Sequence, residues 1–265
     1  MVGRLAQTSS FPLVAAHRGF RELSGAADNS MQAFRDAVAL RVDALELDIH
    51  RTRDGVLVVH HDPEYAGIVI ADTDFAHLPR LHDGQPIARL DEVADLARQS
   101  GVRVAAELKE SGYEQQVVRE LSARMPASQL ELISFNRGSI EAIEQRDPSL
   151  RTGLLEPGLP AWLRNSAAYP AALWVMDKLD WHPAANNAAK LGADYVSVEH
   201  RMATPEFIAA AHDRGLQVHA WTVNDASRMR ELMRDGVDAI VTDRPDVALA
   251  LRTSLPAAPS LPLAA

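Results

Sequence analysis

Short apolar segments alternate with amphipathic segments along most of the chain. Residues 13–16 and 237–242 are rich in branched and small apolar residues, as buried strands are, whereas residues 31–40 place apolar side chains three and four positions apart, as a helix does. This alternation repeats about eight times, which predicts a parallel sheet whose strands are connected by helices. About eight such units in 265 residues favour a (β/α)8 barrel over an open doubly wound sheet.

The order of the expected elements follows from the same pattern. Besides a strand at 13–16 and a hairpin within 43–62, strands are expected at 102–109, 130–135, 152–155, 194–198, 217–223 and 237–242. Helices are expected at 31–40, 90–96, 113–121, 139–145, 181–191, 205–214, 225–234 and 246–251. The polar, irregular residues 63–86 predict a short hairpin/lid insertion after the second strand, and residues 173–176 fit a strand or a helix.

Composition and charge narrow the class of protein. Apolar residues make up 47% of the chain, enough for one large domain over residues 1–252, and the Pro/Ala-rich residues 253–265 are expected to be disordered. The chain has no cysteine, which favours a cytoplasmic location, and its net charge of −9 argues against nucleic-acid or anionic-membrane binding. Residues 1–12 lack the apolar core of a signal peptide and no apolar run has membrane-spanning length, so we expect no stable membrane insertion. Nothing in the sequence indicates the oligomeric state.

The hairpin carries the first candidate chemistry. Asp54-Gly55 lies between two branched apolar runs, and Asp-Gly suits a two-residue hairpin turn because both positions tolerate positive φ. With that turn, Asp48 pairs with His61, so Glu46, Asp48 and His61 share one face of the sheet. The alternative is a solvated sheet face, but the surrounding apolar residues favour an inward-facing site. Paired carboxylates suit a hard divalent cation such as Mg²⁺ or Ca²⁺.

Other strands also end in reactive or charged side chains. His17-Arg18-Gly19 follows the first strand and offers a proton-transfer group, an anion-binding group and room for a ligand. Glu107 and Lys109 lie two apart, hence on one face of their strand. A structural histidine and an internal salt bridge are the alternatives for these two groups. In a barrel, side chains at the carboxyl ends of the strands meet at one mouth, so we expect a single site there.

These motifs together resemble the glycerophosphodiester phosphodiesterase family. The matching pieces occur in the family's order over residues 13–250: His17-Arg18-Gly19, Asn29-Ser30, Glu46-Leu47-Asp48, Asp54-Gly55, His61-Asp62, Glu107-Leu108-Lys109, Ser134-Phe135, Trp221-Thr222-Val223-Asn224 and Thr242-Asp243. The resemblance implies a TIM barrel with one divalent cation, Mg²⁺ or Ca²⁺. It also implies hydrolysis of a small-molecule glycerophosphodiester to glycerol 3-phosphate and an alcohol, within lipid and glycerol metabolism.

The resemblance also assigns roles, one residue at a time. Metal-ligand positions of the family match Glu46, Asp48 and Glu107, and its catalytic histidines match His17 and His61. Its phosphate-binding cations match Arg18 and Lys109, and substrate-binding positions match Asn29, Phe135 and Trp221. One histidine would act as general acid and the other as general base. Which histidine does which, and whether the nucleophile is water or the 2-hydroxyl of the glycerol, stay open.

The chain departs from the family in two places. Asp28 stands where the family usually has Glu, and the segment after His61-Asp62 is short and lacks an Arg-Thr-Thr-like stretch. That segment helps to cover the substrate in the family, so the identity of the alcohol is open. One alternative function is a lysophospholipase D or sphingomyelinase D-like enzyme, with Trp174, Met176 and Trp181 in an apolar mouth. Another is a barrel that binds phosphodiesters without turnover.

Overall fold

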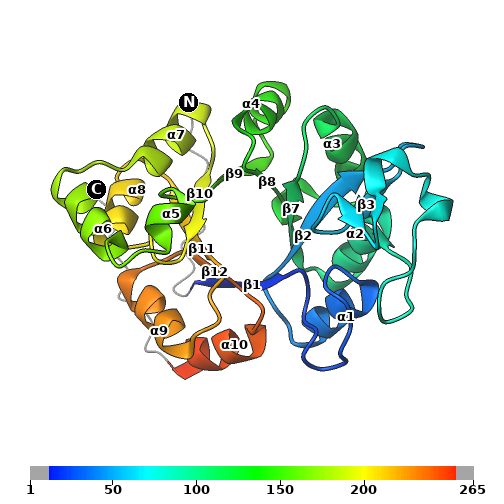
Figure 1. Cartoon of the computed structure of the whole chain (residues 1–265), viewed down its shortest axis with the longest axis horizontal. Helices are drawn as coiled ribbons and strands as arrows, with labels where there is room; N and C mark the ends of the chain where they lie inside the picture. The colour runs from blue at the N-terminus through cyan, green and yellow to red at the C-terminus, as the bar shows by residue number, and fades with distance from the viewer. Residues whose placement is uncertain (1–11, 255–265) are drawn as a thin grey trace.

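A computed structural model describes residues 12–254, and these form the predicted closed barrel. Eight parallel strands follow one another around it, and the first pairs with both the second and the last (Figure 1). They are β1 Leu13–His17, β2 Ala44–Arg51, β7 Arg103–Leu108, β8 Leu130–Ser134, β9 Arg151–Glu156, β10 Tyr195–Glu199, β11 Gln217–Trp221 and β12 Ala239–Thr242. The predicted disordered tail lies mostly outside the described residues, as does most of the N-terminal segment expected to lack a signal peptide.

Helices surround the barrel (Figure 1). Eight connect or follow its strands: α1 Met31–Ala39, α2 Leu90–Ser100, α3 Glu114–Ser122, α4 Arg137–Arg146, α7 Pro183–Leu191, α8 Pro205–His212, α9 Ala226–Asp235 and α10 Pro245–Ser254. Side-chain caps fix where two of these helices begin. The Ser30 hydroxyl accepts a hydrogen bond from the backbone N–H of Ala33 in α1, and the Asp225 carboxylate accepts one from the backbone N–H of Arg228 in α9. A 3-10 turn, η3 Ala127–Gln129, precedes β8.

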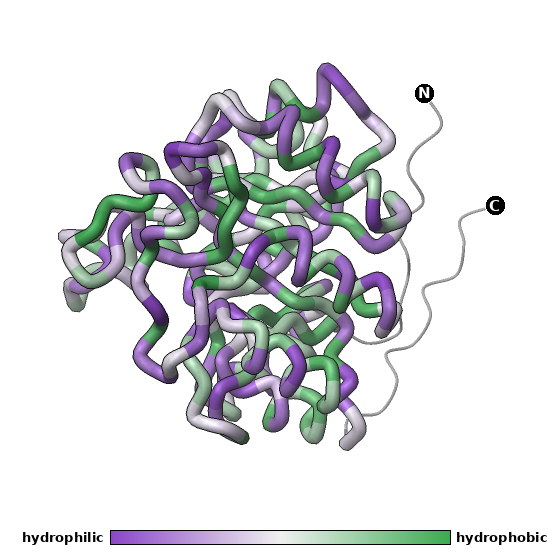
Figure 2. The backbone as a smooth tube through the Cα atoms, turned by 90° about the vertical axis from the view of Figure 1, so that its right-hand side faces the viewer, coloured by the Kyte–Doolittle hydropathy of each residue, from purple (hydrophilic) through white to green (hydrophobic). Residues whose placement is uncertain are grey.

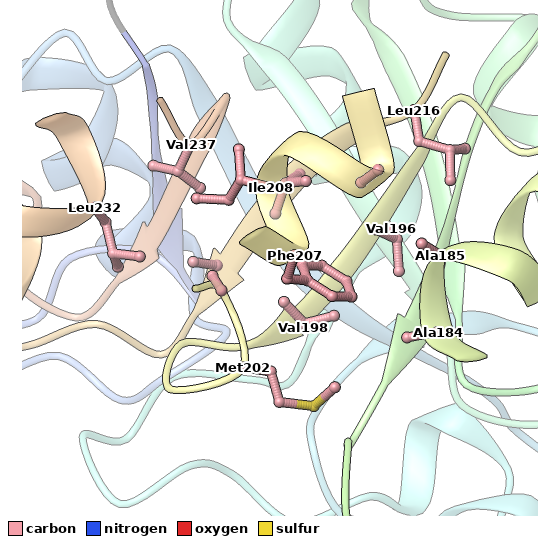
Figure 3. Packing of buried hydrophobic residues seen from close by; sticks show 14 of the residues in the cluster. Ala184, Ala185, Val196, Val198, Met202, Phe207, Ile208, Leu216, Leu232 and Val237 are labelled. Carbon is pink, nitrogen blue, oxygen red and sulfur yellow. The ribbon is translucent and has the colours of Figure 1, made fainter. Parts of the chain in front are cut away.

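The hydrophobic core lies between the strands and these helices. Figure 3 shows one part of it, where Phe207 and Ile208 of α8 pack near Val196 and Val198 of β10. All four side chains are at most 2% exposed. Figure 2 shows hydrophobic segments running through the middle of the molecule and hydrophilic segments in many outer loops. Because all eight strands are parallel, their carboxyl ends meet at one mouth of the barrel.

Short elements between β2 and α2 extend the sheet on one side. Strand β3 Leu57–Val59 pairs antiparallel with β2, and β6 Ala88–Arg89 pairs with β3. A separate pair, β4 Glu64–Tyr65 and β5 Ile68–Val69, is followed by the 3-10 turns η1 Ile70–Asp72 and η2 Phe75–His77. Ile70, Leu81 and Ile87 pack with Val58 into a small core of this segment. A covering role for this segment stays a prediction.

The predicted register of the hairpin is wrong by one residue. Ile49 pairs with Val59 and Arg51 with Leu57, so Asp48 lies opposite His60 rather than His61. The turn holds three residues, 53–55, because the Thr52 hydroxyl accepts the N–H of Val56 and pairs the strands one position earlier. Gly55 has φ +86°, the left-handed conformation that a three-residue hairpin loop requires.

The segment between β9 and α7 forms two helices. They are α5 Ala161–Arg164 and α6 Tyr169–Lys178, so residues 173–176, which fitted either state, are helical. The following helix, expected from residue 181, begins at Pro183. Proline suits the first turn of a helix because its missing N–H has no partner there anyway.

Candidate active site

A cavity of about 150 Å³ opens at the carboxyl ends of the barrel strands. One half of its lining is charged or titratable and comes from β1, β2, β7 and the segment after β3: His17, Arg18, Glu46, His61, Glu107 and Lys109. The other half is mostly apolar and comes from β8 to β12: Ile133, Phe135, Leu155, Ser197, Trp221 and Val241, with Thr222. Eight of the ten predicted site residues therefore line one cavity, and the remaining two, Asp48 and Asn29, are buried beside it.

Three carboxylates cluster at the charged half, where Glu46 and Glu107 line the cavity and Asp48 is buried beside it. Glu46, Asp48 and Glu107 each place an oxygen within 4.8 Å of the others, and all three side chains are buried. They come together because Asp48 of β2 is the register partner of Glu107 of β7, while Glu46 lies two residues earlier on the same face of β2. Backbone geometry thus assembles the triad from two neighbouring strands.

Burial and mutual repulsion oppose full ionisation of the two glutamates in the triad. Burial and the neighbouring charge of Asp48 raise the pKa of Glu46. Burial also raises the pKa of Glu107, although the Lys109 ammonium opposes the shift. For Asp48, burial is outweighed by the charges of Lys109 and Arg18, so its pKa lies below the usual value. Three carboxyl groups this close together suit a hard divalent cation, which would hold all three carboxyl groups in the ionised form.

Two cations and one amide hold Asp48 in place. The Lys109 Nζ lies 3.2 Å from Asp48 Oδ1 and 2.9 Å from Glu107 Oε1. The Arg18 Nε lies 3.2 Å from Asp48 Oδ2, and the Asn29 amide donates to the same oxygen at 2.8 Å. Asn29 is only 1% exposed, so in this structure it positions a carboxylate rather than lining the cavity.

A strained turn after β1 directs Arg18 into the site. Arg18 has φ +56° and Gly19 has φ +90°, and the Arg18 N–H donates to both the backbone oxygen of Glu46 and its side-chain Oε2. A Cβ on Gly19 would lie 2.7 Å from the backbone of Ala33. Only glycine permits this approach of the turn to α1, which explains the Gly in His17-Arg18-Gly19.

His17 is oriented by the last strand of the barrel. Its Nδ1 lies 2.6 Å from Asp243 Oδ1, and the Asn224 amide donates to the other oxygen of Asp243 at 2.7 Å. With Nδ1 engaged, Nε2 is the ring nitrogen left for the cavity. Burial lowers the pKa of His17, but the hydrogen bond with Asp243 and the charge of Glu46 outweigh this and raise it overall.

The two adjacent histidines face different cavities. His61 lines the site, and its Nδ1 lies 2.7 Å from Asp62 Oδ1. Burial and the charges of Arg18 and Lys109 lower the pKa of His61. His60 lies against Tyr65 in an edge-on ring contact and lines a separate cavity of about 460 Å³. His61 reaches the site despite the changed register because it lies beyond the end of β3, where strand alternation no longer applies.

Sequence comparison now decides the family. A sequence model of the glycerophosphoryl diester phosphodiesterase family matches residues 17–247. The chain belongs to this family. It is 30% identical over 247 residues to a probable glycerophosphodiester phosphodiesterase 2 of Mycobacterium tuberculosis, covering 89% of this chain and 88% of the relative. A glycerophosphodiester phosphodiesterase of Caldanaerobacter subterraneus is 26% identical over 259 residues, covering 90% and 97%.

Solved structures share the fold. A phosphodiesterase of Oleispira antarctica, solved in complex with its product sn-glycerol-3-phosphate, superposes with a TM-score of 0.72 at 23% identity. The match covers 91% of this chain and 96% of that one. The likeness shows that the two chains share the same barrel fold.

No role for Asp243 was predicted from the sequence, although Thr242-Asp243 is one of the family motifs. The contact of Asp243 with His17 could nevertheless have been inferred. In a closed barrel the first and last strands pair, and the pairing of Ala16 with Thr242 brings the next residue of each strand, His17 and Asp243, together. Ser197, Leu155 and Ile133 were missed too, because small and apolar residues inside a strand do not differ from core residues in sequence alone.

Proposed function

We propose that this chain hydrolyses glycerophosphodiesters to glycerol 3-phosphate and an alcohol with His17 and His61 as its acid–base pair. Family membership makes the chain a phosphoric diester hydrolase. The observation that carries the assignment of residues is that both imidazoles, Glu46 and Glu107 line one cavity at the mouth of the barrel. The third acid, Asp48, is buried beside that cavity, with a carboxylate oxygen within 4.8 Å of an oxygen of each glutamate.

The cationic residues prepare the cavity for an anionic substrate. A phosphodiester anion repels nucleophiles, and more negative charge develops on its oxygens as the transition state forms. Arg18 and Lys109 offset that charge. Both are held by Asp48, so their positions are fixed before substrate arrives. This local cationic pair also lets an acidic chain of net charge −9 bind an anion.

The two histidines perform the proton transfers. One imidazole removes a proton from the attacking hydroxyl or water, and the other donates a proton to the departing alkoxide. Asp243 holds the His17 ring so that Nε2 faces the substrate, and Asp62 contacts His61 in the same way. Help from each group is worth roughly 10²- to 10⁴-fold in rate.

The apolar half of the cavity suits the carbon skeleton of the glycerol. Phe135 and Trp221 meet edge to face with ring centroids 5.8 Å apart. The Trp221 Nε1 is buried and has no hydrogen-bond partner among residues 12–254, so a substrate hydroxyl would reach it only after a small turn of the indole ring. Binding a hydroxyl there would remove the cost of leaving that N–H unpaired.

We propose Glu46, Asp48 and Glu107 as the ligands of one Mg²⁺ or Ca²⁺. A bound divalent cation would polarise a phosphoryl oxygen and neutralise charge as the transition state forms. The carboxylate donors fit these hard cations better than Zn²⁺ or copper, which prefer nitrogen and sulfur. We also propose that the enzyme is cytoplasmic, a location that the cysteine-free sequence supports. We further propose that it acts in glycerol and lipid metabolism.

One assay with matched variants tests this function. Purified protein with Mg²⁺ or Ca²⁺ should release glycerol 3-phosphate from glycerophosphocholine, and EDTA should abolish the release. We expect His61→Ala to lower kcat roughly 10²-fold or more, whereas His60→Ala, its neighbour in a different cavity, should retain near wild-type activity. Wild-type turnover by both His17→Ala and His61→Ala would remove the acid–base assignment.

A further inference from the structure

Exposed apolar side chains are concentrated in one segment of the chain. Among residues 12–254, eight large apolar side chains are exposed, and five of them lie within residues 162–181. We call these five the tryptophan patch: Trp162, Trp174, Val175, Leu179 and Trp181, which are between 45% and 74% exposed. Three of the four tryptophans of the chain are therefore on the surface of this one segment.

Helix α6 is apolar on two faces, and the fold uses only one. Tyr169, Leu173 and Met176, spaced four and three apart, are buried in the core. Trp174 and Val175, on the opposite face, point outward and are exposed. A helix that is apolar all round is normally covered on all sides, so this outward face lacks a partner among the described residues.

Two contacts attach the segment that carries the tryptophan patch to the carboxyl end of β10, at the mouth of the barrel. The Tyr169 hydroxyl of α6 donates to Glu199 Oε2 at 3.3 Å, and Arg201 Nη1 donates to the backbone oxygen of Arg164 in α5 at 3.0 Å. Glu199 lies two residues beyond Ser197 on β10, hence on the same face, and Ser197 lines the catalytic cavity. Figure 1 shows α5 beside β10 and α6 farther out on the same side.

The segment that carries the patch is electrically neutral, unlike the rest of the molecule. Residues 157–182 hold two cations, Arg164 and Lys178, and two anions, Asp177 and Asp180. The whole chain carries −9. The Lys178 Nζ lies 6.0 Å from the ring centroid of Trp174, and Asp177 is engaged by the Thr204 hydroxyl. A neutral apolar surface with a tryptophan-rich composition does not attract an anionic partner over a distance and does not repel a zwitterionic one.

We propose that the tryptophan patch docks the mouth of the barrel on a zwitterionic phospholipid surface. Tryptophan is the residue that membrane–water interfaces favour, because its ring is apolar and its N–H is polar, and Lys178 can reach from the patch to the headgroups. Docking there turns the catalytic cavity toward glycerophosphodiester groups at the bilayer surface. This last consequence rests on the proposed function, whereas the docking itself does not.

Vesicle binding tests the docking independently of catalysis. Full-length protein in EDTA is mixed with phosphatidylcholine vesicles, and the bound fraction is measured by sedimentation and by the shift of tryptophan fluorescence to shorter wavelength. We expect wild type to bind and the double variant Trp174→Ser/Val175→Ser to bind at least about 10-fold more weakly, because two large apolar side chains no longer leave water on docking. Val69→Ser, which alters an exposed apolar residue outside the patch, is the matched control and should bind as wild type does.

Three results would overturn the proposal. They are no binding of wild type to phosphatidylcholine vesicles, equal binding by the double variant, or a dimer in solution that the double variant abolishes, which would assign the face to a second copy of the chain. Release of glycerol 3-phosphate from soluble glycerophosphocholine should be unchanged in the double variant, which shows that its catalytic cavity is intact. Failure of wild type in that assay would overturn the proposed function and leave the docking result standing.

Discussion

Two histidine–aspartate hydrogen bonds in this molecule have different structural roles. In the cavity, Asp243 contacts Nδ1 of His17 at 2.6 Å. On the outside of the barrel, Asp238 contacts Nε2 of His212, at the end of α8, at 2.8 Å and also accepts the N–H of Val218. The first pair holds a ring at the wall of the cavity, and the second connects a helix to two strands.

Removing the charge of Asp243 should impair catalysis while the fold survives. Asp243→Asn keeps the shape but no longer selects the ring orientation of His17, so we expect kcat to fall about 10²-fold. Steady-state release of glycerol 3-phosphate measures the effect. Asp238→Asn makes the same change in the outer pair and should lower stability without changing kcat. Equal kcat in both variants would contradict the orienting role of Asp243.

The outer pair should contribute stability that depends on pH. The hydrogen bond with Asp238 raises the pKa of His212 in the folded protein above its unfolded value. The resulting stabilisation is full below the unfolded pKa of about 6.5 and is lost as pH rises through the folded pKa. His212→Gln should therefore cost more stability at pH 5.5 than at pH 8.5 in urea unfolding. The imidazole is 42% exposed, so we expect a difference below about 1 kcal/mol.

At the residue scale, the sequence indicated the groups with distinctive chemistry. Glu46, Asp48 and Glu107 could be found because burying a charged side chain among apolar strand residues costs free energy unless the charge is paired or binds a metal. Asp243 acquires its role only from contact with a residue 226 positions away. No local pattern encodes that contact, so it could be inferred only by combining the motif with barrel closure.

At the scale of elements, the interior of the barrel depends on matched side-chain sizes. Gly153 of β9 lies beside Tyr195 of β10, and a Cβ there would be 2.1 Å from the tyrosine ring. Tyr195 is itself stacked on His219 at 3.8 Å and lies under Arg151. The ring has nowhere to move, so glycine is required for its size rather than for its backbone freedom.

Gly153→Ala should therefore destabilise the barrel. Overpacking of this kind costs about 1–3 kcal/mol, which thermal or urea unfolding can measure. The double variant Gly153→Ala/Tyr195→Leu should lose less than the sum of the two single variants, because removing the ring makes room for the methyl group. Strict additivity would show that the two side chains do not compete for space.

The sequence predicted which elements exist better than how they pair. Alternating apolar and amphipathic segments indicated all eight barrel strands. The register of the hairpin was wrong because Asp-Gly occurs in both two- and three-residue turns, and the Thr52 hydroxyl decides between them. The state of residues 173–176 could not be predicted, because a helix that is apolar on two faces has no periodic polar positions.

At the scale of the whole molecule, strands from both halves of the barrel build one mouth, and a cation there should stabilise the entire fold. None of the helices in residues 12–254 is long and apolar enough to cross a membrane.

The acidic triad joins β2 to β7 at the mouth of the barrel. A cation that binds only when these strands are paired adds its binding energy to the stability of the barrel.

Mg²⁺ or Ca²⁺ should therefore raise the melting temperature of protein first treated with EDTA. At about 100 times its Kd, a cation adds about 2.7 kcal/mol, which differential scanning calorimetry can detect. Glu46→Gln should lose this response together with activity. Glu199→Gln changes another buried carboxylate near the same mouth and should keep the response. An unchanged response in Glu46→Gln would exclude Glu46 as a ligand.

The closing seam of the barrel has a consequence for the protein during its own synthesis. Strand β1 pairs with β12, which follows it by more than two hundred residues. While a ribosome is still adding the later strands, β1 has a free edge and His17 has no aspartate beside it. The barrel can close only when β12 has joined β1, so translation products that end before β12 should hydrolyse phosphodiesters far more slowly than the complete chain.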